Sequence, residues 1–211
     1  MPNDHRHYDE TDAGPEWGTP KWVWQPLAET LGGFDLDPAS GAEEEPIAYV
    51  RVQLPTDEHP YGTAVREEGV TTWYGDGLEE GWHGDVWLNP PYGRQHNPRW
   101  AQKVSEEVER GALDTLTALV PASTSTNWFQ DHYANADLLT FIDQRISFDG
   151  SGSDSASFAS VIATFGDVPT AYVDALGELG FVVSTDVSAV RATAPREPST
   201  VTPEPNRGGV R

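Results

Sequence analysis

The chain has 211 residues, no cysteine and a formal net charge of −21, which arises from 34 acidic and 13 basic residues. The lack of cysteine excludes a disulfide framework, a thiolate zinc site and a cysteine nucleophile. No apolar stretch of the sequence is long enough to span a membrane and no signal peptide pattern is present, so we expect one cytoplasmic domain.

The acidity of the chain allows two interpretations. Carboxylates can serve as a general solubility device, or they can reflect adaptation to high salt, where self-repulsion is screened and the surface stays hydrated. Only two of the 13 basic residues are lysines, Lys21 and Lys103. We favour the second interpretation, which predicts a protein of an extreme halophile or of its virus.

Signals for helices and strands alternate along the chain. Residues 1–14 are polar and lack periodicity, which predicts a flexible arm. Thr19 and Pro20 predict a helix start, with Thr19 as N-cap and Pro20 in the first turn. Residues 41–70 are interpreted as an insertion. In chain order, the elements predicted from apolar runs and periodicity are a helix over 20–31, strands over 34–36 and 47–52, a loop over 55–69, a strand over 86–88, a helix over 98–110, a strand over 113–120, a helix over 124–136, strands over 138–142, 145–148 and 158–165, a helix over 169–179 and a strand over 181–187.

This alternation favours an α/β fold in which strands and helices build a mostly parallel, doubly wound sheet. The domain is expected to occupy residues 15–190. From Ala192 onward Pro, Thr, Glu and Gly dominate, so residues 191–211 are predicted to be a disordered tail.

The tetrapeptide Asn89-Pro90-Pro91-Tyr92 follows the apolar run 86–88. Two prolines remove two backbone donors and fix φ twice, so neither a helix nor a strand can continue through them. The turn can instead hold an amide, a carbonyl and an aromatic ring at a strand's carboxyl end, where open α/β sheets bind ligands. Asn89 Oδ1 and the Pro90 carbonyl can accept the two hydrogens of an exocyclic amine. An accessible Tyr92 can stack on the flat heterocycle that carries this amine. The alternative is an ordinary tight turn.

Several further motifs occur with this tetrapeptide in a fixed order: 17–23, 34–39, 76–78, 86–94 and 119–122. The series resembles the phage-type DNA N-6-adenine methyltransferases (the Dam-like family) over residues 15–166. The resemblance implies a Rossmann-like class I methyltransferase fold with a seven-stranded sheet and an antiparallel C-terminal strand. It implies S-adenosylmethionine as methyl donor and double-stranded DNA as partner. It also implies that Asn89, Pro90, Pro91 and Tyr92 are the catalytic residues. The histidines, His132 among them, have no metal-ligand spacing, so we expect no metal.

The resemblance implies a cofactor site near the end of the first strand. In the family an acid ends this strand and small residues follow, and Asp37, Pro38 and Ala39 occupy these positions here. An ordinary Asp-Pro turn is the alternative.

Two further segments are implied to bind the cofactor. Trp17, Thr19 and Pro20 precede a helix whose start suits the methionine carboxylate, although Thr19 also reads simply as a helix cap. Asp76 is implied to lie near the cofactor's adenine, although Asp-Gly is more often only a turn. The acid that holds the ribose is expected after the second strand. Asp57 and Glu58 are unconvincing candidates for it.

Four basic residues are candidates for phosphate contacts: Arg94, Arg99, Lys103 and Arg145. Each could equally be a solvated surface charge. The acidity of the chain conflicts with DNA binding, because phosphate contacts need cations and salt weakens them.

The expected reaction is methylation of adenine N6 in DNA, as viral or prophage modification against restriction. The expected assembly is a monomer or weak dimer. Two alternatives remain from the residues: another acceptor (N4-cytosine, RNA adenine or protein glutamine), or a non-catalytic relative that binds DNA.

Overall fold

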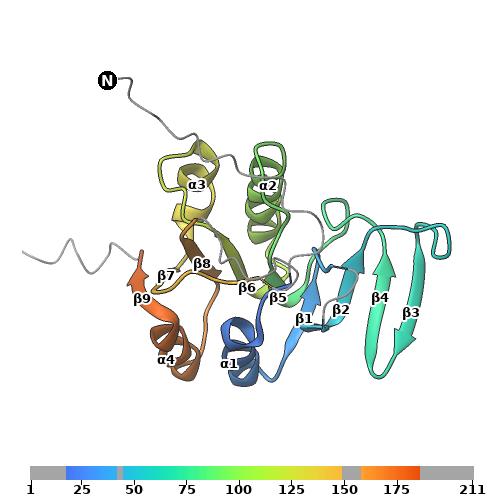
Figure 1. Ribbon diagram of the computed structural model, residues 1–211, viewed down its shortest axis with the longest axis horizontal. Helices are drawn as coiled ribbons and strands as arrows, with labels where there is room; N and C mark the ends of the chain where they lie inside the picture. The colour runs from blue at the N-terminus through green and yellow to red at the C-terminus, as the bar shows by residue number, and fades with distance from the viewer. Residues whose placement is uncertain (1–17, 42–44, 149–157, 186–211) are drawn as a thin grey trace, which may run out of the picture.

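The computed structural model describes residues 18–41, 45–148 and 158–185. The predicted arm (1–14), the cofactor candidate Trp17 and the predicted tail (191–211) lie outside these residues. Within them, one sheet runs through the molecule and helices cover both of its faces (Figure 1). None of the helices in these ranges is long and apolar enough to cross a membrane.

The described residues form a sheet of nine strands in the order β3-β4-β2-β1-β5-β6-β8-β7-β9. Neighbours from β4 through β6 are parallel, whereas β3, β8 and β9 run antiparallel to the strands they pair with. The strands are β1 (Phe34–Asp37), β2 (Ala48–Gln53), β3 (Thr63–Glu67), β4 (Val70–Tyr74), β5 (Gly84–Leu88), β6 (Leu113–Pro121), β7 (Leu138–Ile142), β8 (Ser160–Phe165) and β9 (Gly180–Ser184).

Helices pack on each face of the sheet over separate apolar clusters (Figure 1). Trp100 of α2 belongs to one cluster and Val23 of α1 to the other. Val86 and Trp87 of β5 enter opposite clusters, because successive side chains of a strand point to opposite faces. The helices are α1 (Lys21–Leu31) and α4 (Thr170–Leu179) on one face, and α2 (His96–Arg110), α3 (Asn127–Asp131) and a 3₁₀ turn (Tyr133–Asn135) on the other.

The chain reverses its direction of travel across the sheet between β1 and β5. From β1 the chain extends through β2 to β4 on one side, and from β5 it continues into β6 on the other. β1 and β5 are parallel, with Leu36 opposite Val86. Asp37 at the end of β1 and Asn89 just beyond β5 therefore lie at the same edge. Open α/β sheets bind ligands at such a reversal point.

Several predicted elements are confirmed with their ends. The strand over 138–142 is present as β7, and the last strand, β9, is antiparallel to its neighbour as expected. Helices α1 and α2 end at Gly32 and Gly111, and both glycines have the left-handed conformation that favours glycine at a helix end.

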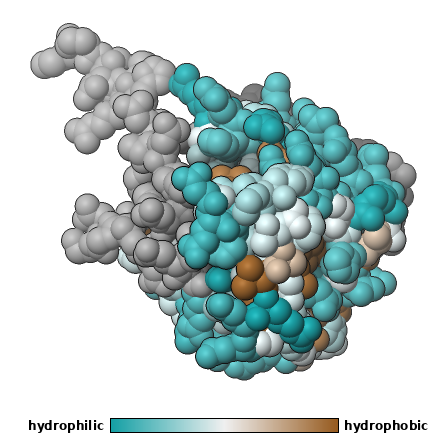
Figure 2. Space-filling model, turned by 90° about the vertical axis from the view of Figure 1, so that its right-hand side faces the viewer, coloured by the Kyte–Doolittle hydropathy of each residue, from teal (hydrophilic) through white to brown (hydrophobic). Residues whose placement is uncertain are grey.

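The prediction of a seven-stranded, mostly parallel sheet is wrong, because nine strands of mixed direction are present among the described residues. The predicted loop over 55–69 contains β3, which pairs with β4 in an antiparallel hairpin. β3 was missed because it is an edge strand whose side chains are mostly exposed, so it lacks an apolar pattern. This end of the molecule presents a largely hydrophilic face (Figure 2). The region 41–70 also supplies β2, between β1 and β4, so it is not a simple insertion.

Two predictions in the C-terminal half are wrong. The residues over 145–148 form no strand; Ile146 and Phe148 are buried in the cluster of α1 and α4, which explains their apolar alternation. The predicted helix over 124–136 is shorter, because α3 ends at Asp131 and a 3₁₀ turn follows.

Candidate active site at the carboxyl edge of the sheet

Asn89 leaves the end of β5 and is held by a residue that precedes α1. Its Nδ2 donates to Thr19 Oγ1 at 3.0 Å, a hydrogen bond between positions 70 residues apart. Pro90 and Pro91 have no backbone N–H, so the ladder of the sheet ends at this turn. Thr19 is buried and Asn89 is half-buried. The hydrogen bond therefore fixes the orientation of the amide at the carboxyl edge.

Thr19 is not the N-cap of α1, contrary to the prediction. The helix begins at Lys21, Pro20 occupies the cap position and no side chain caps the helix. The Thr19 hydroxyl accepts from Asn89 instead. A hydroxyl that accepts one hydrogen bond can still donate one, so this contact does not exclude a ligand at Thr19.

Tyr92 holds the other end of the Asn89 amide. Its hydroxyl donates to Asn89 Oδ1 at 2.7 Å and lies 3.3 Å from the Leu119 carbonyl oxygen. Burial raises the pKa of Tyr92 well above its usual range, so the hydroxyl stays protonated and can donate. The ring is 5% exposed and packs edge-on against Phe148 and Phe158. The expectation of an accessible Tyr92 ring is wrong in this structure, because Phe148 and Phe158 cover the ring. Both residues are distant in sequence, so local patterns could not predict this contact.

Asp37 closes β1 and organises the turn that follows. Its side chain is 3% exposed, and its Oδ1 accepts from the Ala39 backbone N–H at 3.0 Å. The far end of the turn is tied to β2, because Gln53 Nε2 donates to the Gly41 carbonyl at 2.7 Å. The Asp-Pro turn is thus present. A carboxyl group offers several acceptor positions, so the turn does not by itself exclude a ligand at Asp37.

Asp76 follows β4 and lies in a loop against that turn. Its Oδ1 accepts from the Leu78 backbone N–H at 2.9 Å. The next residue, Gly77, lies so close to Pro38 that a Cβ on Gly77 would be 1.9 Å from the Pro38 carbonyl oxygen. The loop of Asp76 and the turn of Asp37 are therefore in direct backbone contact, and both predicted acids belong to adjoining segments at one edge.

The acid expected after the second strand is not found at its end. β2 ends in Gln53, and Asp57 and Glu58 are exposed in the loop beyond it. The sequence analysis did not single out Gln53, which holds the turn after β1 through its hydrogen bond to Gly41. A polar side chain at the end of a strand is the feature that could have indicated it.

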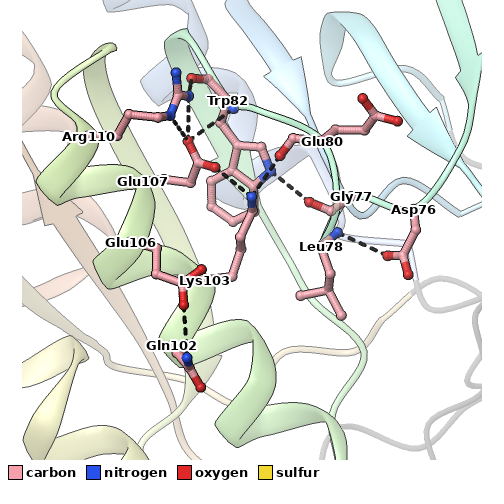
Figure 3. Close-up of polar contacts among 10 residues, drawn as sticks. All are labelled: Asp76, Gly77, Leu78, Glu80, Trp82, Gln102, Lys103, Glu106, Glu107 and Arg110. Carbon is pink, nitrogen blue, oxygen red and sulfur yellow. Dashed lines mark hydrogen bonds and ion pairs between the residues drawn. The ribbon is translucent and has the colours of Figure 1, made fainter.

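Lys103 does not face solvent, so the prediction that it contacts DNA is wrong. It is 9% exposed. Its Nζ donates to the Glu80 carbonyl at 2.7 Å and to Glu107 Oε1 at 2.5 Å (Figure 3). The same nitrogen lies 5.5 Å from the centre of the Trp82 ring. The four-residue spacing of Lys103 and Glu107 was readable from the sequence, but the loop that covers them was not.

The predicted arginines are exposed around the carboxyl edge. Arg94 lies in the turn before α2 and Arg99 in the first turns of that helix. Arg145 follows β7, which is antiparallel to β8, as β8 is to β6. β7 therefore runs in the direction of β5 and β6, and Arg145 lies beyond the same edge as Asn89.

A groove of about 340 Å³ runs along α1. Lys21, Trp24, Glu29 and Gly33 are among its lining residues. Neither Asn89 nor either predicted acid lines it, so it is not the predicted cofactor site.

No group of three or more histidine, aspartate or glutamate side chains in the described ranges could hold a metal ion. His132 contacts Ser105 instead, with 2.7 Å between Nδ1 and Oγ.

Comparisons with known proteins point to one family. Residues 63–165, which include Asn89 to Tyr92, match the model of a family described as DNA N-6-adenine-methyltransferase (Dam). The DNA N-6-adenine-methyltransferase of Escherichia phage T1 is 29% identical over 140 residues, which cover 66% of this chain and 50% of the phage protein. The chain thus spans about half the length of this relative. These matches confirm the resemblance that the motifs indicated.

A comparison with solved structures finds the crystal structure of a candidate RNA methyltransferase from Pyrococcus horikoshii. The TM-score is 0.42 and the sequence identity 14%, over 71% of this chain and 82% of that protein.

The contact between Gly77 and Pro38 predicts a stability difference between two glycine substitutions. Gly77→Ala should destabilise the protein by about 1–3 kcal/mol, because the new methyl group must displace backbone. The control is Gly177→Ala, since Gly177 is exposed within α4 with open space around it. That change should stabilise the helix by about 0.5–1 kcal/mol. Urea unfolding measures both, and a Gly77→Ala variant as stable as Gly177→Ala would contradict the packing described.

Proposed function

We propose that this chain transfers a methyl group from S-adenosylmethionine to the N6 amino group of adenine in double-stranded DNA. The observation that carries the proposal is the Asn89 amide, which follows the strand next to β1 and is hydrogen-bonded at both ends. The matches to DNA N-6-adenine methyltransferases support adenine as the acceptor. The chain would work in the cytoplasm as a monomer or weak dimer and protect viral or prophage DNA against restriction.

The proposed chemistry needs acceptors rather than a strong base. The lone pair of an adenine amine is delocalised into the ring, so the amine is a weak nucleophile. Asn89 Oδ1 and the Pro90 carbonyl would accept its two hydrogens and localise the lone pair on the face toward the methyl donor. A carbonyl oxygen has two lone pairs, so Oδ1 can accept from the amine while it accepts from Tyr92.

We propose that Tyr92 positions Asn89 and is not a stacking platform in the described state. Its ring would have to leave Phe148 and Phe158 to receive a base, because it is only 5% exposed. Its hydroxyl already fixes the carbonyl end of the Asn89 amide. An amide fixed at both ends needs little reorganisation when the acceptor arrives.

The side chains at the carboxyl edge fit S-adenosylmethionine by their chemistry. The donor carries a sulfonium and an ammonium group, and the carboxylates of Asp37 and Asp76 lie in adjoining segments at that edge. It also carries a carboxylate, for which the start of α1 beside Thr19 is suited. When bound, the cofactor supplies the methyl group. The residues of the chain would bind it, orient it and exclude water from it.

DNA binding would rest on few cations. Arg94, Arg99 and Arg145 lie exposed beyond the same edge as Asn89, and arginine suits phosphate oxygens. The adenine has to leave the base stack to reach a site at the end of a strand. Base contacts would come from the loops around this edge.

Replacement of the catalytic amide tests the proposed function directly. Asn89→Ala should reduce methyl transfer by about 10²–10³-fold or more, because preorganised polar groups at a reacting atom act on this scale. Cofactor affinity should stay unchanged, since the amide faces the acceptor. The assay offers labelled cofactor with separate DNA, RNA and protein substrates, and nucleoside analysis identifies the methylated base.

A matched control for this assay is Asn135→Ala. Asn135 is exposed and its amide contacts only a helix carbonyl in its own segment, so transfer should be unaffected. Transfer that survives Asn89→Ala would refute the proposed mechanism, and methyl groups on cytosine, RNA or glutamine would replace the proposed acceptor.

The hydrogen bond between Asn89 and Thr19 predicts different results for two substitutions of Thr19. Thr19→Val keeps the shape of the side chain but removes the acceptor, and kcat should fall about 10–100-fold as the amide loses its orientation. Thr19→Ser keeps a hydroxyl and should retain most activity. Steady-state kinetics with both variants checks this, and equal activities would show that the hydroxyl does not position Asn89.

We also propose that the acidity is an adaptation to high salt. Raising the ionic strength from about 0.1 M to about 1 M shortens the Debye length from about 10 Å to about 3 Å, which screens the repulsion of a chain with net charge −21. The melting temperature should rise over this range. Sucrose is the control, because it favours the compact state without screening charge. A melting temperature that responds to sucrose but not to KCl would contradict the adaptation.

A further inference from the structure

We propose that Lys103, Glu107 and Arg110, here called the α2 charge cluster, position the loop that carries Asp76 and thereby set the affinity of the cofactor site. This inference rests on the proposed function, since it concerns the site where S-adenosylmethionine would bind. Figure 3 shows the cluster on α2 and the loop, residues 76–82, that it contacts.

The α2 charge cluster binds main-chain groups of the loop. Lys103 Nζ donates to the Glu80 carbonyl at 2.7 Å, and Glu107 Oε2 accepts from the Trp82 backbone N–H at 3.1 Å. Arg110 donates to the Trp82 carbonyl. All three charged side chains therefore fix the path of the loop's backbone, which is a different task from pairing with one another.

The cluster is also tied together internally. Glu107 lies between two cations, with Oε1 2.5 Å from Lys103 Nζ and Oε2 2.7 Å from Arg110 Nε. Burial raises the pKa of Glu107, but hydrogen bonds from Lys103, Arg110 and the Trp82 backbone lower it more, so the pKa lies below its ordinary value. Glu107 is thus ionised at neutral pH and holds both cations toward the loop.

Trp82 relays the position of the cluster to the Asp76 end of the loop. Its side chain is 0% exposed and stacks on Trp100 of α2, with 6.2 Å between the ring centres. Its indole Nε1 donates to the Gly77 carbonyl at 2.8 Å. Gly77 follows Asp76 and lies against Pro38, so a displaced loop would move both predicted cofactor acids relative to each other.

Stability alone is a weak reason for these charges. A buried ion pair can often be replaced by apolar side chains without loss of stability, because removing charges from water offsets their attraction. The side chains of Lys103 and Glu107 are only 11% and 5% exposed. This chain has just two lysines and a net charge of −21, and one of those lysines is withdrawn from the surface to hold a loop carbonyl. Directional hydrogen bonds to backbone groups are what an apolar cluster cannot supply.

The test compares Glu107→Gln with Glu106→Gln in the full chain. Glu106 precedes Glu107 on α2, is exposed and contacts Gln102 rather than the loop (Figure 3). Glu107→Gln should raise the dissociation constant of S-adenosylmethionine, measured without DNA, by about 10-fold, the scale on which residues behind a binding site act. kcat at saturating cofactor should change less than about 2-fold, since Asn89 is untouched. Glu106→Gln should match the wild type in both.

A second variant keeps the test decisive if Glu107→Gln does not fold. Trp82→Phe retains an aromatic ring against Trp100 and removes the indole N–H that donates to Gly77, together with part of the buried ring volume. It should also weaken cofactor binding with kcat preserved.

A folded variant of either kind that binds the cofactor as tightly as Glu106→Gln would overturn the inference and leave the proposed function standing. A wild-type protein that binds no S-adenosylmethionine would overturn both.

Discussion

The hydrogen bond from Asn89 to Thr19 is the constraint on which the rest of the site depends. It joins the end of β5 to the segment before α1, and α1 leads directly into β1. β1 and β5 are adjacent at the reversal point of the sheet, so this bond and the strand pairing together hold the Asn89–Tyr92 turn, the start of α1 and the Asp37 turn at a single edge. The Tyr92 hydroxyl donates to the carbonyl end of the same amide, and the Tyr92 ring is buried in the core.

Local patterns were enough to predict the elements that define this edge. β5 and β7 carry short apolar runs, and β1 alternates Phe34 and Leu36 with aspartates. Gly32 and Gly111 are typical of helix ends, and both have the left-handed backbone there. The apolar pattern gave wrong predictions where the burial of a segment depends on its tertiary contacts. β3 is exposed at an edge and shows no apolar alternation, whereas the residues over 145–148 alternate because they fill the core from a loop.

The candidate site shows the same division between what is local and what is distant. The tetrapeptide was enough to predict that Asn89 lies just beyond the end of a strand, because the two prolines that follow it cannot continue the strand. It could not give the state of Tyr92, since Phe148 and Phe158 lie far along the chain. Lys103 was assigned to DNA from its closeness in sequence to Asn89. In the fold it turns to the 76–82 loop, which is distant in sequence.

The burial of Lys103 also bears on how so acidic a chain could bind DNA. Lys21 is paired with Glu45 at 2.7 Å, whereas Arg94, Arg99 and Arg145 lie exposed beyond the edge that carries Asn89, so the proposed phosphate contacts would fall mainly to these three arginines. Affinity for duplex DNA falls with salt at a logarithmic slope of about −0.9 for each phosphate neutralised. A protein with few such contacts starts from a weaker electrostatic attraction, but it also loses less of it in strong salt. Specific binding then has to come from base contacts around an extruded adenine, whose amine Asn89 would hold. The scarcity of cations and the hydrogen-bonded Asn89 amide are thus compatible with the proposed function, in which base recognition would carry most of the affinity.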